Sequence, residues 1–331
     1  MFLVGSCAVE ESAVRFEQIG RVWPDSVDPA RIAYVGEFSN ADDLEIRESF
    51  WRSVISVVVG PVEDALVRPM DVAATPDAQI IFVADPDAGC VHRYDLGRRK
   101  YRCLSTGRGE AAISAIGVTV TEDGHLFATD SMQGGIWQAG PEDTELTPFY
   151  TSKELAQPTG IHWRQDTQRL YVTDTTRHRV LEYDRAGNLK RTIGTRGADA
   201  AQFNYPTYLW IDAKQELLVA DSLNFRVQRF GKDANFVSAF GQDGDRPGDF
   251  SRPKGIATDD FGHVYVSDSL MHALQIYTPD GELLLSIGNQ GQGEGEFWLP
   301  AGMFITPDNT IFVADSYNKR IQVFRYIGQE S

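Results

Sequence analysis

The chain has 331 residues, of which 42% are apolar and 24% are charged, a composition typical of a soluble globular protein. Its 31 basic and 47 acidic residues give a net charge of -16, which repels phosphate backbones and anionic membrane surfaces and excludes nucleic acid as an expected partner. No apolar run approaches the roughly 20 residues that a membrane-spanning helix needs.

The first 30 residues are expected to form a signal remnant and a tether. Residues 2–6, which precede Cys7, are apolar or small. Bacterial lipoprotein signals have the same order, in which an apolar region and a box of small residues precede the cysteine that is lipidated. Too few residues precede Cys7 for a complete signal, so this would be a truncated one; a disordered end with a chance cysteine is the alternative. Residues 8–30 are charged and lack periodicity, as in a tether. Lipidation of Cys7 would place the protein in the periplasm or the outer cell envelope, with the lipid as its only membrane contact.

Residues 31–66 contain a predicted strand and a predicted helix. The segment RIAYVGEF at 31–38 is apolar and ends near a glycine, which is the pattern of a strand. In the insertion at 40–66, residues 40–60 have the pattern of a helix that Asn40 caps and that Gly60 and Pro61 end. The helix is expected to cover the neighbouring sheets; alternatively, its part around Trp51 stays exposed as a docking surface.

From residue 67 onward the chain repeats itself six times. An apolar run ends in aspartate every 44 to 47 residues, preceded by a run such as RPKGIA and followed by runs such as RVQRF and FVSAFG. The six aspartates are Asp85, Asp130, Asp174, Asp221, Asp268 and Asp315. Four short β-rich runs per repeat predict one four-stranded antiparallel sheet for each repeat.

Six such sheets around an axis form a six-bladed β-propeller, an all-β fold. Blades are expected at residues 67–107, 112–151, 157–194, 204–241, 251–288 and 298–326, with a tail at 327–331. The last repeat ends at Tyr326 without a fourth strand. Because residues 31–38 have the pattern of that missing strand, we expect the N-terminal segment to close the ring as the outer strand of the last blade.

Glycine-rich segments at 194–206, 241–253 and 288–300 are three copies of one connector between blades. A phosphate-binding loop would lead from a strand into a helix, and no helix is predicted after any of them. The calcium-like spacing of Asp243, Asp245 and Asp249 is broken by Pro247 and lacks a closing glutamate. The glycines are therefore interpreted as turn residues that adopt positive φ.

The markers P-x-G-[IV]-A, [YF]-V-[AS]-D-S and N-x-R-[VI]-Q-[VR]-F resemble the NHL repeat, most fully at residues 253–277 and 300–324. The resemblance covers residues 31–326 and is weaker in the first two blades. The segment WPDSVDPARIAYVGEF is similar to bacterial six-bladed propeller lipoproteins of unassigned role, whose relatives accompany c-type cytochrome systems. Components of such a system are thereby implied as candidate partners, although this chain has no C-x-x-C-H for a haem of its own.

The resemblance implies a fold but not a function, because the family includes RNA binders, sensors, interaction platforms and a metal-dependent lyase acting on peptidyl-hydroxyglycine. The six strand-ending aspartates are interpreted as structural, since a group needed once for chemistry would not recur in every blade. Each is expected to accept backbone N–H bonds or to pair with the arginine five residues later: Arg179, Arg226 and Arg320.

Two histidines, His178 and His272, stand four residues after Asp174 and Asp268 and resemble the zinc ligands of the lyase relatives. A catalytic zinc needs a third protein ligand, and the matching positions in the other blades hold no histidine. Metal binding by this pair is therefore the weaker alternative, and no cofactor is expected.

Departures from the repeat predict a binding site. The inner-strand glycine is replaced by Asp71 in the first blade and by Tyr208 in the fourth, near Tyr205 and Trp210. Together with Lys254 these residues are expected near the top mouth of the central channel, the top being the face that carries the connectors between blades. They are hypothesised to bind a ligand or partner; side chains that merely fill the channel are the alternative.

Cys90 and Cys103 flank the turn between the third and fourth strands of the first blade, where facing positions can be bridged. A disulfide there would fit an oxidising compartment, and two buried free thiols are the alternative.

These observations favour a non-catalytic binding or scaffold propeller of the bacterial cell envelope, with an unknown protein or small ligand on its top face. A metal-dependent lyase or hydrolase at the same mouth is the alternative, so enzymatic activity is left open.

Overall fold

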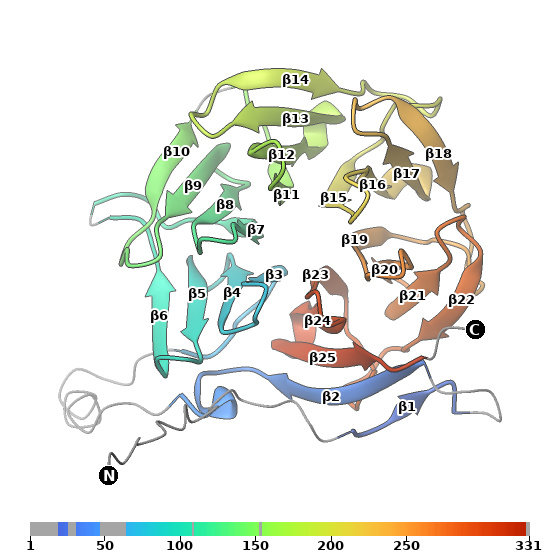
Figure 1. Ribbon diagram of the computed structural model, residues 1–331, viewed down its shortest axis with the longest axis horizontal. Coiled ribbons are helices and arrows are strands. Elements are labelled where there is room, and N and C mark those ends of the chain that lie inside the picture. Colours follow the sequence, from blue (N-terminus) through green and yellow to red (C-terminus); the bar gives the residue numbers. More distant parts are fainter. Residues whose placement is uncertain (1–18, 26–30, 47–63, 108, 152–153, 329–331) are drawn as a thin grey trace, which may run out of the picture.

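Six antiparallel sheets surround a central axis and form a closed ring (Figure 1). The computed structural model describes residues 19–25, 31–46, 64–107, 109–151 and 154–328. The predicted all-β, six-bladed propeller is confirmed. Within those residues, no helix is long and apolar enough to cross a membrane.

Five blades of four strands each follow one another along the chain, and in each the strands run in order from the axis to the rim (Figure 1). The first two blades contain β3 (Asp71–Ala74), β4 (Ile80–Asp85), β5 (Cys90–Asp95) and β6 (Lys100–Leu104), then β7 (Ala115–Val120), β8 (Leu126–Asp130), β9 (Gly135–Ala139) and β10 (Thr147–Thr151). The next two contain β11 (Pro158–Arg164), β12 (Arg169–Asp174), β13 (Arg179–Asp184) and β14 (Leu189–Ile193), then β15 (Pro206–Ile211), β16 (Leu217–Asp221), β17 (Arg226–Phe230) and β18 (Phe236–Phe240). The fifth contains β19 (Pro253–Thr258), β20 (Val264–Asp268), β21 (Ala273–Tyr277) and β22 (Leu283–Ile287).

The core lies between neighbouring blades. Every residue of the second strands β8, β16 and β20 is buried, because both faces of these strands pack against other blades. The outer strand β18 is exposed along most of its length. This arrangement explains why the inner strands are apolar throughout instead of alternating with polar residues.

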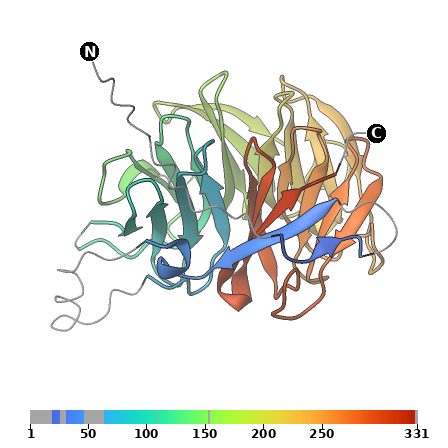
Figure 2. The same cartoon turned by 60° about the horizontal axis from the view of Figure 1, so that its bottom comes forward.

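The N-terminal strand closes the ring. The sixth blade contains β23 (Pro300–Ile305), β24 (Thr310–Asp315) and β25 (Arg320–Tyr326), and β2 (Ile32–Phe38) pairs antiparallel with β25. Figure 2 shows β2 lying along the outer side of this blade. The predicted closure is therefore confirmed, and it joins the two ends of the propeller in one sheet.

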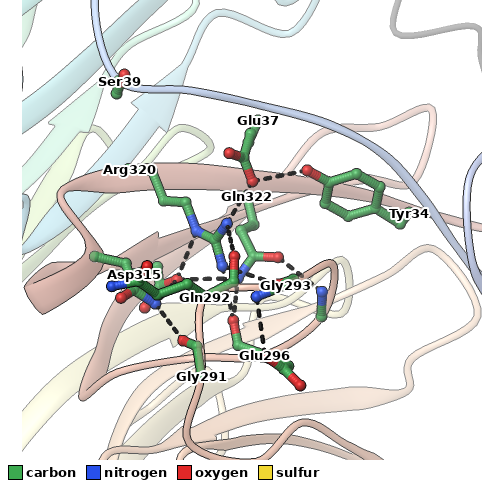
Figure 3. A network of polar contacts seen from close by, with 12 residues as sticks. Tyr34, Glu37, Ser39, Gly291, Gln292, Gly293, Glu296, Asp315, Arg320 and Gln322 are labelled. Atoms are coloured by element: carbon green, nitrogen blue, oxygen red, sulfur yellow. Dashed lines mark hydrogen bonds and ion pairs between the residues drawn. The ribbon is translucent and has the colours of Figure 1, made fainter.

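Polar contacts reinforce this closure beyond the strand pairing (Figure 3). Arg320 of β25 donates to Glu37 of β2 at 2.6 Å and to Asp315 of β24 at 2.8 Å. Tyr34 of β2 donates its hydroxyl to the same Glu37 carboxylate at 2.8 Å. Because Arg320 itself is buried, its pairing with both carboxylates links β2 to the interior of the last blade.

Two segments differ from the sequence-based expectation. Within the predicted tether, β1 (Val22–Trp23) adds a fifth strand beside β2. Trp23 is buried and packs against Phe324, with ring centroids 6.0 Å apart, so an aromatic contact outside the repeat orders this part of the chain.

No α-helix begins at Asn40 within the described residues. Its side-chain oxygen accepts hydrogen bonds from the backbone N–H groups of Asp42 and Asp43, but only a single 3-10 turn follows, η1 (Asp42–Leu44). Glu45 ends that turn at a φ of 54°, a left-handed conformation that stops helix growth. The remainder of the predicted helix, with Trp51, lies outside the described residues, as does Cys7.

The three glycine-rich connectors wrap around buried phenylalanines. Gly241, at the end of β18, has a φ of 104°, and a Cβ atom built there would lie 2.4 Å from the ring of Phe250. The connectors after β14 and β22 repeat the arrangement with Phe203 and Phe297, and all three rings are fully buried. These glycines therefore serve turn geometry and close packing.

Candidate binding face

Hydrogen bonds tie the connectors between blades to the ends of the second strands, and together they form the top face. At each second-strand end a fully buried aspartate accepts backbone N–H bonds. In the fifth blade, Asp268 accepts from Ser251 at 2.7 Å and from Arg252 at 3.0 Å, both in the preceding connector. Asp130 differs, because among the described residues it accepts only from Met132 and Gln133 of its own loop. Each carboxylate thus stabilises the top-face loops around it.

Three of these aspartates pair with the arginine five residues later. The nitrogen-to-oxygen distances are 3.0 Å for Arg179 with Asp174, 2.9 Å for Arg226 with Asp221 and 2.8 Å for Arg320 with Asp315. Short 3-10 turns separate the two partners, namely η2 (Thr175–Arg177), η3 (Ser222–Asn224) and η4 (Ser316–Asn318). In these three blades the aspartate–arginine ion pair therefore stabilises the loop between the second and third strands.

The two loop histidines also contact connector backbone. Nδ1 of His178 accepts the N–H of Tyr205 at 3.1 Å, and Nδ1 of His272 accepts the N–H of Leu299 at the same distance. A neutral imidazole that accepts at Nδ1 carries its proton on Nε2, which leaves no lone pair for a metal ion. Within the part of the chain that the structure describes, no three His, Cys, Asp or Glu side chains form a group that could hold a metal.

Tyr208 crosses the central channel. Starting from β15, its hydroxyl donates to the carbonyl of Met70 at 2.7 Å and reaches that of Ile116 at 3.1 Å, in the first and second blades. Asp71 is buried beside it and accepts the N–H of Val118 at 3.0 Å. Burial raises the pKa of Asp71 well above its usual range, and burial together with Asp71 raises the pKa of Tyr208. These two departures from the repeat lie inside the channel and close it.

Lys254 lies beside the channel on the top face. Its side chain is half-buried, and its ammonium group makes no hydrogen bond or ion pair with any residue that the structure describes. Burial, followed by the nearby charges of Arg252 and Arg68, lowers its pKa to about 8. Three cationic side chains thus lie near one another, and of these Arg68 is paired with Asp87 at 2.7 Å.

Exposed apolar side chains gather on the same face. Twelve large apolar side chains are exposed among the described residues, and six of them belong to top-face loops. These six are Val67, Met132, Tyr205, Leu270, Trp298 and Tyr317. The rings of Trp298 and Tyr317 have centroids 5.6 Å apart. Because Tyr317 also lies near Arg68, aromatic and cationic groups meet where the last blade adjoins the first.

The structure does not bring all the sequence-predicted residues together. Tyr205 and Lys254 are on the top face, and Asp71 and Tyr208 are inside the channel. Trp210 lies beyond them, in a cavity formed by the turns between first and second strands at the opposite mouth. Cys90 and Cys103 are linked by a disulfide with their Cα atoms 5.7 Å apart.

Sequence reasoning missed Arg68, Arg252, Trp298 and Tyr317. The two arginines could have been found from the sequence, because each directly precedes the proline of an inner strand, in VRPM and SRPK. The other blades have no basic residue at this position. Trp298 and Tyr317 lie within or beside the repeat motifs, and the repeat alone does not tell which variable positions are exposed.

Comparison with known proteins agrees with this architecture. Residues 297–324 match the NHL repeat family model. Virginiamycin B lyase from Staphylococcus aureus superposes with a TM-score of 0.59 at 15% identity, over 79% of this chain and 96% of the lyase. An auxiliary nutrient binding protein from Bacteroides thetaiotaomicron gives a TM-score of 0.63 at 13% identity, over 80% of this chain and 71% of that protein.

Hydrazine synthase from Kuenenia stuttgartiensis gives a TM-score of 0.55 at 14% identity, over 81% of this chain and 98% of that chain. Enzymes and binding proteins thus share the architecture, and identities this low establish the fold alone. The chain is a six-bladed β-propeller that carries an NHL repeat.

Proposed function

We propose that the protein is a non-catalytic binding propeller whose top face holds a partner through an anionic group and apolar contacts. The observation that carries this proposal is the unpaired Lys254, with Arg252 and Arg68 near it, on the face whose loops carry six exposed apolar side chains. An ammonium group without a protein partner is available for a carboxylate or phosphate. Aromatic side chains around a desolvated charge are typical of binding hot spots.

The lyase or hydrolase alternative has less support. Its suggested ligands, His178 and His272, each accept a backbone N–H with Nδ1. Metal analysis of protein purified without chelator tests it, because a stoichiometric bound ion would favour catalysis.

A cell-envelope location is part of the proposal. The disulfide between Cys90 and Cys103 supports it, since such bonds persist in oxidising compartments. The sequence around Cys7 supports a lipid anchor. Cell fractionation tests both: the protein is expected with membranes, and Cys7→Ala is expected to release it into the soluble periplasmic fraction.

Affinity capture from the native envelope fraction tests the binding role. Wild-type protein is compared with Lys254→Glu, which reverses the central charge, and with Tyr317→Ala. Lys214→Glu, in a turn at the opposite mouth, is the matched control. Components of c-type cytochrome systems are examined first, by haem staining of the captured proteins.

Both top-face variants are expected to lose a partner that wild type and Lys214→Glu retain. High salt is expected to weaken the same capture, because screening reduces the attraction to an exposed anion. Equal capture by all four proteins would refute the top-face proposal.

A further inference from the structure

The mouth opposite the top face contains a cavity of about 420 Å³ to which all six blades contribute. Its walls are the ends of the inner strands and the turns that follow them. Tyr208 closes the channel on the inner side, where a space of about 10 Å³, sufficient for roughly one water molecule, separates it from the cavity floor. The lower cavity is therefore a blind pocket and not the entrance to a pore.

Equivalent inner-strand positions form the floor. Thr119, His162, Trp210 and Phe304 contribute in blades two, three, four and six, whereas the equivalent Ala73 and Ala257 are fully buried and do not line the cavity. Three blades contribute rings: His162 and Trp210 have centroids 4.5 Å apart, and Trp210 and Phe304 have centroids 5.5 Å apart. Thr119 contributes a small polar side chain, so the floor combines a wall of rings with a hydroxyl group.

His162 has no polar partner. Neither of its ring nitrogens makes a hydrogen bond with a described residue, although the ring lines both the lower cavity and the small space behind it. Burial lowers its pKa to about 4, so at neutral pH the ring is uncharged and offers one donor and one acceptor. The ring is half-buried and lines the cavity, so its nitrogens are available to a polar ligand that enters it.

Two threonine hydroxyls in the wall are also incompletely used. Thr258 accepts the indole N–H of Trp210 at 3.0 Å, and Thr119 accepts the backbone N–H of Trp163 at 3.2 Å. Neither hydroxyl donates to another described residue. Both protons remain available for an acceptor in the cavity.

Three charged groups of the wall are committed to protein partners, whereas Glu122 and Asp260, which also line the cavity, are exposed to solvent. Asp212 pairs with Arg229 at 3.0 Å, and Asp259 binds His263 at 2.8 Å and Tyr265 at 2.9 Å. Arg164 is held by Asp166 at 2.8 Å. Among the described lining residues, the charges without an ion pair are these two exposed carboxylates, so no buried charge calls for an ionic ligand. A wholly apolar ligand would leave His162 and the threonines without a polar partner.

We propose that the lower cavity is a second binding site, for an uncharged carbohydrate of one or two rings. Trp210 and Phe304 contact the apolar face of the sugar ring, and His162, Thr119 and Thr258 bind its hydroxyl groups. Apolar walls with a few placed polar groups are typical of small-molecule sites. This site goes beyond the proposed top-face function and lies at the opposite end of the channel.

Titration of uncharged monosaccharides and disaccharides tests the proposal, monitored by tryptophan fluorescence and by amide NMR shifts. At least one sugar is expected to shift the amides of β11, β15 and β23. His162→Leu is expected to weaken binding about tenfold through the lost hydrogen bonds, and Phe304→Leu to weaken it by a similar factor. Trp210→Phe is expected to reduce the fluorescence response, with Trp163 as the remaining tryptophan in the cavity lining.

Lys254→Gln, on the top face, is the control and should bind the sugar like wild type. Sugar binding at the lower cavity is thus tested independently of partner binding at the top face. Unchanged thermal unfolding shows that each variant is folded. The proposal is overturned if no sugar shifts these amides, or if a folded His162→Leu protein binds with wild-type affinity.

Discussion

At the residue scale, the aspartates that end the second strands of the blades have different hydrogen-bond partners. Asp315 accepts from the backbone of Trp298 at 2.7 Å and from the side chains of Asn318, Arg320 and Gln322. Asp130 accepts two backbone bonds of 3.0 Å, and its second carboxylate oxygen has no partner among the described residues. Both side chains are fully buried, so the difference lies in their partners.

Asp315→Asn is therefore expected to destabilise the protein more than Asp130→Asn. The first change removes one of the two carboxylate partners of the buried Arg320 and disturbs the bonds from Trp298, Asn318 and Gln322, a loss of about 2–3 kcal/mol although Glu37 remains. The second weakens two local hydrogen bonds and is expected to cost about 1 kcal/mol. Urea unfolding of both variants measures the difference, and equal midpoints would contradict this account of the repeat.

Asp71 provides a prediction that depends on pH. Its pKa is raised in the folded protein because the carboxyl group is buried, so the folded state keeps a proton that the unfolded chain releases above about pH 4. The free energy of unfolding is therefore lowered as pH rises from that value through the folded pKa.

Asp71→Asn removes this titration and keeps an oxygen for the N–H of Val118. We expect the variant to be more stable than wild type by more than about 1 kcal/mol at pH 7.5, with the gain disappearing near pH 4. Thermal unfolding across this pH range measures it, with Asp280→Asn in an exposed turn as the control. A gain independent of pH would show that the Asp71 carboxyl is not protonated in the fold.

Periodicity could predict which residues maintain the scaffold but not where the exceptional residues point. The ion pairs of Arg179, Arg226 and Arg320 follow from the repeat alone. Tyr205, Tyr208 and Trp210 are close in sequence, yet one is on the top face, one crosses the channel and one lines the lower cavity. A strand advances about 3.3 Å per residue, so five residues span much of the height of a blade.

At the element scale, the connectors depend on backbone conformation as much as on side chains. Gly241 combines a φ of 104° with close contact to Phe250. Gly231, in the turn between β17 and β18, lies outside the positive-φ region, and a Cβ atom added there would have its nearest neighbour 3.7 Å away.

Gly241→Ala is expected to destabilise the protein by about 2–4 kcal/mol, because strain and overlap with the ring add together. Gly231→Ala is the matched control and is expected to change stability by less than about 1 kcal/mol. Urea unfolding measures both. Similar stability of the two variants would mean that the connector adapts without cost.

The strands inside the repeat could be predicted because the same sequence pattern recurs in six blades. The closing strand β2 could be predicted because the sixth repeat has no fourth β-rich run of its own. Strand β1 and the turn η1 lie outside the repeat, where a contact such as that of Trp23 with Phe324 decides the conformation. Such contacts join residues about 300 positions apart, and no local pattern records them.

At the scale of the whole molecule, β2 connects the last blade with the first. It pairs with β25 in the sixth blade, and Phe38 at its end packs against Tyr94 of the first blade, with ring centroids 5.4 Å apart. Phe38 and Ile32 are both fully buried. Removing this strand would expose apolar surface in two blades and leave β25 as an unpaired edge.

Removal of residues 1–38 is therefore expected to lower the free energy of unfolding by more than about 5 kcal/mol, from the loss of several buried side chains. For a chain of this size, that corresponds to a fall in Tm of more than about 10 °C. Removal of residues 1–18 keeps β1 and β2 and serves as the control, with a Tm expected near that of the full chain. Hydrogen exchange should show lost protection in β25 and also in β5, which carries Tyr94, because the strand joins both blades. If protection fell in the sixth blade alone, β2 would be an edge strand of that blade and not the element that holds the ring together.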